Sequence, residues 1–175
     1  MKNIFLTLTL FFATALSAQV AIGKTSISSP AVSLEFYDNA DNTRGIILPW
    51  VTNTAAVTGA VNGTLVYNTA DKKIYVKYAS GWRDLSVDNT GAVNTTLQDS
   101  LTDQDSAKVL IGGDPATDTT PGILVLADTN KAMVLPKVAS PHLKIVNPSP
   151  GMIVYDTTKK QLAVFNGTVW SFWKP

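Results

Sequence analysis

The chain has 175 residues, with 14 basic and 13 acidic side chains, a formal net charge of +1 and no cysteine. A near-neutral chain lacks the basic face that releases counterions from phosphate, so nucleic acid is excluded as an expected partner. The lack of cysteine excludes disulfides, cysteine-ligated zinc and lipid attachment to a cysteine, although an exported protein would be allowed disulfides.

Residues 1–18 have the pattern of a secretory signal peptide. A short positive start at Lys2 precedes an apolar run at 4–16, and small residues near Ala18 suit cleavage. The run is shorter than the ~20 residues that a spanning helix needs, and no later run is apolar enough to span. We predict export, with cleavage after Ala18 or after Ser17, to the periplasm, the cell surface or the medium. We expect no transmembrane segment.

A first β-rich unit is predicted at residues 19–87. Alternating apolar and polar residues, or short apolar runs, indicate strands at 32–36, 45–48, 64–67 and 73–78. Pro49 ends the second of these because proline has no N–H to give to a ladder. In the last of them, Ile74, Val76 and Tyr78 form one face, which we expect to be core. The opposite face is expected to be free to change.

A polar linker is predicted at residues 88–107. The segment is rich in Asp, Asn, Thr, Ser and Gln and contains no aromatic residue, so it cannot bury enough apolar area to offset the entropy of ordering. A short helix at 95–106 is the alternative.

A second β-rich unit is predicted at 108–175, because the sequence pattern of residues 63–85 is repeated at 151–173. Three matched pairs are each 88 positions apart: Gly63 and Gly151, Tyr67 and Tyr155, Trp82 and Trp170. Two upstream matches have offsets of 87 and 89: Leu48-Pro49 with Leu135-Pro136, and Ile22-Gly23 with Ile111-Gly112. Self-similarity of this kind indicates duplicated structural units. The predicted fold class is therefore all-β, with two tandem small β-meander or hairpin units joined by a polar linker.

Units this small are marginal alone, so the two must pack on each other or oligomerise. The matched Trp82 and Trp170 are expected to be core. Trp50 and Trp173 have no matching tryptophan in the other copy, and with Phe172 they are the candidates for an interface.

Catalytic and metal-binding groups are scarce. His142 is the only histidine and Glu35 the only glutamate, which excludes Cys–His pairs and ordinary zinc sites. A serine triad would need His142, and no Gly-x-Ser-x-Gly elbow is present. The aspartates and asparagines at 38–42 could donate oxygens to calcium, but they lack the spacing of a calcium loop. We predict no enzyme, no catalytic residue, no cofactor and no metal.

Several motifs together resemble a β-rich repeat of secreted surface proteins of Bacteroidetes-type bacteria and of phage tail-fibre-like proteins. The motifs of the first unit are VAIGKT (20–25), TRGIILP (43–49), GTLVYNT (63–69) and GW (81–82), and those of the second are VLP (134–136), GMIVYDT (151–157) and FNGTVW (165–170). Trp50 and Lys137 stand where that repeat usually has arginine. The resemblance implies a structural or adhesive extracellular role, often in trimeric fibres, and no catalytic residues.

The same bacterial group attaches O-glycans at Asp-Ser or Asp-Thr motifs. Four residues here fit that pattern: Ser100, Ser106, Thr119 and Thr157. Composition alone is the other explanation.

Three functions remain open. The first is a secreted, non-catalytic structural or adhesive protein whose partner is another protein, including a homotrimer of itself. The second is a carbohydrate-binding module that stacks a glycan on Trp50, Tyr37 or Tyr78. The third is an accessory subunit of an outer-membrane complex, with an envelope protein as partner.

Overall fold

The computed structural model describes residues 19–102, 104 and 106–174, and the predicted signal peptide lies outside this part. The regular secondary structure of the described chain consists almost wholly of short strands, so the predicted all-β fold class is confirmed. Its only α-helix is one turn long, and nothing helical in the described part could cross a membrane.

The first unit contains seven strands and one short 3-10 helix. In chain order these are β1 (Val20–Ile22), β2 (Val32–Phe36), β3 (Ile46–Ile47), β4 (Trp50–Val51), η1 (Thr54–Ala56), β5 (Leu65–Asn68), β6 (Lys73–Tyr78) and β7 (Gly81–Asp84). The second unit follows the same order: β8 (Val109–Ile111), β9 (Leu124–Leu126), β10 (Ala132–Val134), β11 (Lys137–Val138), α2 (Pro141–Lys144), β12 (Met152–Asp156), β13 (Gln161–Phe165) and β14 (Trp170–Trp173). The repeat in the sequence is therefore a repeat of elements.

Each unit ends in the antiparallel meander that the sequence predicts. β5, β6 and β7 pair in order in the first unit, as β12, β13 and β14 do in the second. The two copies keep the same register, because Trp82 lies opposite Lys77 and Trp170 lies opposite Phe165. A short strand also runs parallel to the start of each meander, β4 beside β5 and β11 beside β12.

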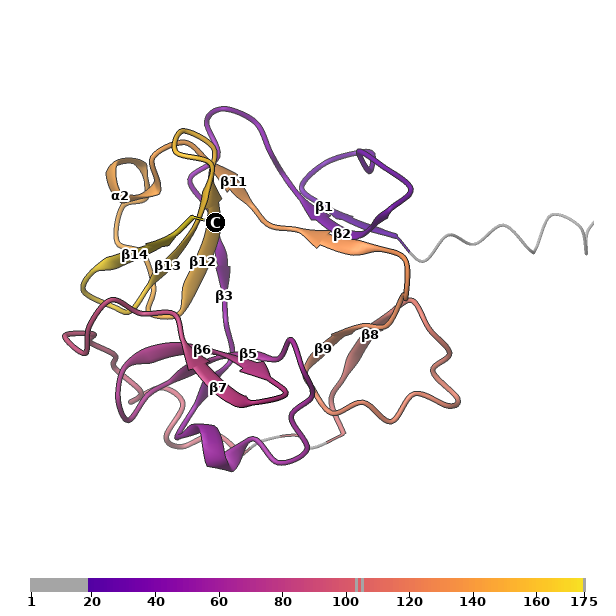
Figure 1. Ribbon diagram of the computed structural model, residues 1–175, viewed down its shortest axis with the longest axis horizontal. Coiled ribbons are helices and arrows are strands. Elements are labelled where there is room, and N and C mark those ends of the chain that lie inside the picture. The colour runs from indigo at the N-terminus through magenta and orange to yellow at the C-terminus, as the bar shows by residue number, and fades with distance from the viewer. Residues whose placement is uncertain (1–18, 103, 105, 175) are drawn as a thin grey trace, which may run out of the picture.

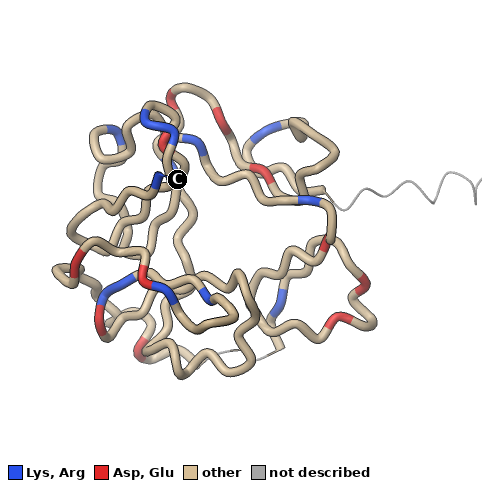
Figure 2. Tube along the Cα trace, in the orientation of Figure 1, with Lys and Arg blue, Asp and Glu red and all other residues tan. Residues whose placement is uncertain are grey.

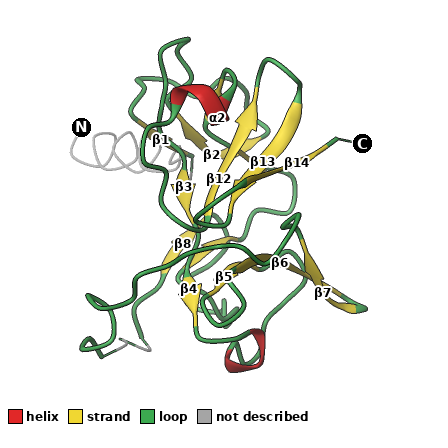
Figure 3. Cartoon of the chain, turned by 90° about the vertical axis from the view of Figure 1, so that its left-hand side faces the viewer, coloured by secondary structure: helices red, strands yellow, loops and turns green. Residues whose placement is uncertain are grey.

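Two strands pair with the other unit. β3 of the first unit lies antiparallel to β12 of the second, with Ile47 opposite Met152 and Ile46 opposite Ile153. β10 of the second unit lies parallel to β2 of the first. Figure 1 shows β3, in purple, running beside the yellow strands of the second unit, and Figure 3 shows the same strand from the side. Strand pairing between the units thus joins repeats that are about 88 residues apart in the chain.

The main hydrophobic core is shared by both units. Its buried members are Leu48, Tyr67, Ile74 and Leu85 from the first unit and Ile153 and Val164 from the second. Neither unit alone supplies this core, so packing of the units on each other is one route by which the small repeats gain stability.

A second cluster corrects the expectation that one face of each meander is free to change. In the second unit, Ala163 and Phe165 lie on that face, and both are buried in the cluster. The remaining members are Val138, Ile145, Met152 and Val154, with Trp170 packed against them. In the first unit the matching positions are Tyr75 and Lys77, which are only half-buried. Trp82 is half-buried beside Lys77 and belongs to neither cluster, so its expected core position is wrong.

Candidate interaction surface

The contact between the units centres on Tyr67. Its side chain is fully buried, and its hydroxyl donates a hydrogen bond of 2.8 Å to the backbone carbonyl of Asn166. Burial, with a smaller contribution from the Asp71 carboxylate, raises the pKa of the Tyr67 hydroxyl to about 12. Gly151 lies against the same tyrosine, and a Cβ built on it would be 2.9 Å from Tyr67 Cβ. The second unit therefore needs glycine at this position, where φ is +80°.

Trp50, a predicted interface residue, lies between the two units. Its indole Nε1 donates a hydrogen bond of 3.0 Å to the carbonyl of Pro150, and its ring packs against Tyr67 at 6.1 Å between centroids. The half-buried ring is thus already engaged within the chain. The other two residues of the sugar-stacking alternative, Tyr37 and Tyr78, are 38% and 46% exposed.

Trp173 and Phe172, the other predicted interface residues, occupy opposite faces of β14. Trp173 Nε1 donates a hydrogen bond of 2.6 Å to the carbonyl of Leu85, and the Arg83 guanidinium lies 5.3 Å from its ring centroid. Phe172 is 37% exposed and meets His142 edge to face at 5.7 Å. Trp173 therefore joins the two units, whereas Phe172 stays on the surface.

The junction between the first unit and the predicted linker is held against the second unit. The Val87 amide donates to Ser171 Oγ at 2.7 Å, and Asp88 Oδ1 accepts from Asn166 Nδ2 at 3.1 Å. Gly91 is buried between the backbone carbonyls of Asn166 and Lys72. No helix forms in the described part of residues 95–106, where the chain makes turns.

A charged cluster ties the turn after β2 to the start of β11. Lys24 Nζ lies 2.8 Å from Glu35 Oε1 and 3.3 Å from Asp38 Oδ2, and Lys137 Nζ lies 3.3 Å from Asp38 Oδ2. Burial alone would raise the pKa of the Glu35 carboxyl, but hydrogen bonds from Lys24 Nζ and the Ser28 amide outweigh it and lower that pKa. The buried Glu35 is therefore a paired carboxylate with a structural role.

The other basic and acidic residues are scattered along the trace (Figure 2). Within the ranges that the structure covers, no three acidic, histidine or cysteine side chains gather in a way that could hold a metal ion. His142 is exposed on α2. The arrangement offers strand edges and apolar side chains for contact.

The four predicted glycan acceptors, Ser100, Ser106, Thr119 and Thr157, are all exposed. Ser100 and Ser106 lie in turns of the predicted linker, and Thr157 directly follows β12. Their positions are accessible to a modifying enzyme, and their glycosylation stays a prediction.

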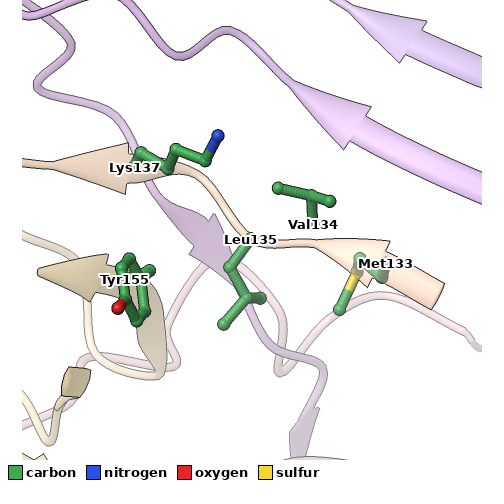
Figure 4. Close-up of a pocket in the computed structure, with 5 residues that line it drawn as sticks. All are labelled: Met133, Val134, Leu135, Lys137 and Tyr155. Atoms are coloured by element: carbon green, nitrogen blue, oxygen red, sulfur yellow. The ribbon is translucent and has the colours of Figure 1, made fainter. Parts of the chain in front are cut away.

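An open apolar pocket of about 350 Å³ lies where β10 passes into β11, beside β12. It is lined by Met133, Val134, Leu135, Lys137 and Tyr155 (Figure 4). In the first unit the matching residues are Ile46, Ile47, Leu48, Trp50 and Tyr67, where the second unit packs. The pocket is thus the uncovered copy of a surface that is covered in the first unit.

Sequence reasoning missed most of these contact residues. Tyr67, Gly151 and Tyr155 are matched positions of the repeats, but no local signal shows that Tyr67 reaches the second unit. The signal available was the exact match of glycine and tyrosine at one offset, which indicates a duplicated fold and leaves open which copies touch.

Comparisons with known proteins give one match. The family model described as phage tail like trimerisation region matches residues 114–174, which contain β9 to β14. No curated protein and no solved structure matches the chain. The second unit is therefore similar to a structural, tail-fibre-like family, while the resemblance to Bacteroidetes-type surface proteins stays a prediction.

Proposed function

We propose that this protein is a structural subunit of a tail-fibre-like assembly, which acts as a homotrimer through protein–protein contacts and has no catalytic role. The observation that carries the proposal is the match of residues 114–174 to a trimerisation region. Export by the predicted signal peptide and a place at the cell surface or in the envelope complete the proposal.

The surface chemistry supports contact with protein. In the described chain, the strands at the ends of all four sheets keep an unpaired edge, and such edges are templates for pairing with another chain. Large apolar side chains are exposed on or next to these strands, among them Ile47 at 51% and Leu124 at 46%. Because the net charge of the chain is close to zero, electrostatic repulsion between copies is weak and permits self-association.

Native mass spectrometry of the exported protein tests the proposal. We expect a species of three chains, each with its first residue at position 19. A single-chain mass at micromolar concentration would overturn the trimer. A chain that keeps residues 1–18 after expression in a secreting host would overturn export.

A further inference from the structure

The two units of the chain meet through two different faces. The face of the first unit that makes this contact consists of β2, β3 and Tyr67, and we call it the donor face. The face of the second unit that it meets consists of β10, residues 151–153 and the turn at Asn166, and we call it the receiver face. Because the faces differ, the contact is head-to-tail, and contacts of this type can continue to further copies or close into a ring.

The second unit carries its own donor face, which no strand of the described residues covers. Met133 and Val134 of β10 match Ile46 and Ile47 of β3, at an offset of 87. Tyr155 matches Tyr67, but it is 37% exposed, whereas Tyr67 is fully buried. The apolar pocket of Figure 4 lies on this face.

The first unit likewise carries an uncovered receiver face. Leu65, which matches Ile153, pairs with Val76 of β6, and the sheets of the described chain place no strand on its other side. Gly63 matches Gly151 and also has positive φ, at +91°, but a Cβ built on it would meet no atom within 4 Å. The space that Tyr67 fills beside Gly151 is therefore open beside Gly63.

We infer that the donor face of the second unit binds the receiver face of the first unit of another copy, by adding β10 antiparallel to β5. This inference rests on the proposed homotrimer and deepens it. Transferring the observed register of β3 on β12 places Val134 opposite the partner's Thr64 and Met133 opposite the partner's Leu65. Three copies joined in this way close a ring in which every donor face is covered.

The tyrosine contact is repeated in this arrangement. Tyr155 packs on the partner's Gly63, and its hydroxyl donates to the carbonyl of the partner's Tyr78, the residue that matches Asn166. Both tyrosines are exposed in the single chain, at 37% for Tyr155 and 46% for Tyr78. The contact buries them and satisfies the phenol hydroxyl.

A second pair of open edges fits the same relationship. β10 pairs with β2 inside the chain, with Met133 opposite Leu34. The matching strands, β3 and β9, have no partner on the corresponding edges among the residues that the structure describes. By the same transfer, Leu124 of β9 comes opposite Ile46 of another copy. One relationship thus accounts for two unpaired edges and for the exposed Leu124 and Ile47 on them.

The occupant is a second copy of this chain because the receiver face is shaped for the repeat itself. At the one receiver face that is covered, the covering strand is β3, whose sequence Ile46-Ile47-Leu48-Pro49 is matched by Met133-Val134-Leu135-Pro136. Both strands are apolar and both end on proline, which stops the ladder at the same place.

Engineered disulfides test the pairing, since the chain has no cysteine of its own. The Leu48 amide donates to Gly151 O, so the neighbouring pair Ile47 and Met152 lies at a position without ladder hydrogen bonds, where Cα atoms are about 4.5 Å apart. The matching intermolecular pair is Thr64 and Val134. We expect the oxidised Thr64→Cys/Val134→Cys variant to run as a covalent trimer on a non-reducing gel. Each single variant should run as one chain.

Two controls accompany this variant. Ile47→Cys/Met152→Cys should close within one chain and report that the oxidation works. Thr64→Cys/Met133→Cys is one residue out of register, points its thiols to opposite faces of the sheet and should not cross-link. A native trimer without cross-linking of the in-register variant would overturn this inference and leave the proposed trimer standing. A single-chain native mass would overturn both, and cross-linking of a single variant into pairs would show a symmetric contact and overturn the head-to-tail pairing.

Discussion

Tyr67 of the first unit donates its phenol hydrogen bond to the backbone carbonyl of Asn166 in the second, at 2.8 Å and in a fully buried setting. These residues are 99 positions apart in the chain. The bond lies where the paired strands of the two units, the shared core and the Asn166 turn meet. The two repeats are thus joined by a specific polar contact as well as by apolar packing.

Removing that hydroxyl should destabilise the protein. We expect Tyr67→Phe to lower the free energy of unfolding by about 1–2 kcal/mol, because it leaves the buried Asn166 carbonyl without its donor. Urea unfolding followed by tryptophan fluorescence measures the change. Tyr37→Phe is the matched control: Tyr37 is exposed and donates to Asp41 at 3.2 Å, so the loss should stay below about 0.5 kcal/mol. Equal losses in both variants would contradict the role of the buried contact.

A methyl group on Gly151 should be costly. Gly151→Ala combines a positive φ with a Cβ that would lie 2.9 Å from Tyr67 Cβ, and we expect a loss of about 3 kcal/mol. Gly63→Ala has the same type of backbone strain and open space around the new methyl, so about 1–2 kcal/mol is expected for the single chain. Thermal or urea unfolding of both variants at low protein concentration gives the comparison. A greater loss for Gly63→Ala in the single chain would contradict the assignment of the two faces.

The shared core should be sensitive from the side of the second unit. Ile153 is 1% exposed and packs among residues of the first unit. Ile153→Ala should therefore cost about 3 kcal/mol, from lost transfer free energy and the cavity left behind. Ile123→Ala, at 64% exposure, is the control and should change stability by less than about 0.5 kcal/mol. Hydrogen exchange on Ile153→Ala should show loss of protection in β5 and β6 of the first unit. Loss confined to the second unit would mean that the core is not shared.

Stability should fall in acid because of Glu35. The folded-state pKa of this carboxyl is below its ordinary value of 4.5, so as the pH falls the unfolded chain takes up the proton first. The contribution of the Lys24–Glu35 pair is present above that ordinary value and is lost as the pH falls through the folded-state pKa. Glu35→Gln should lower the urea midpoint at pH 7 and flatten its dependence on pH below about 4.5. An unchanged acid limb in the Glu35→Gln variant would show that other carboxyls set the acid stability.

The sequence predicted what depends on local patterns. Alternation, turn residues and the repeat itself predict the three-stranded meanders and their identical register around Trp82 and Trp170. Pro49 marks the end of one predicted strand. The parallel pairing of β1 with β2 was not predicted, because three-residue strands leave too little pattern to read.

The contact surface could not be read in the same way. Pairing of β3 with β12 depends on residues far apart in the chain, and two apolar residues such as Ile46 and Ile47 carry no information about which edge they will join. Trp50 was noted as unmatched in the other copy, but its hydrogen bond to Pro150 became visible only in the folded chain. The burial of Ala163 and Phe165 also depends on neighbours, because Val138 and Ile145 belong to the same buried cluster.

Sedimentation equilibrium of the exported chain, measured over a range of protein concentrations, tests the central claim most directly. A fit to one species of three chains, about three times the mass of the mature polypeptide, is the predicted result. A species of one chain throughout the range would contradict the assignment of this protein as a trimeric, tail-fibre-like structural subunit.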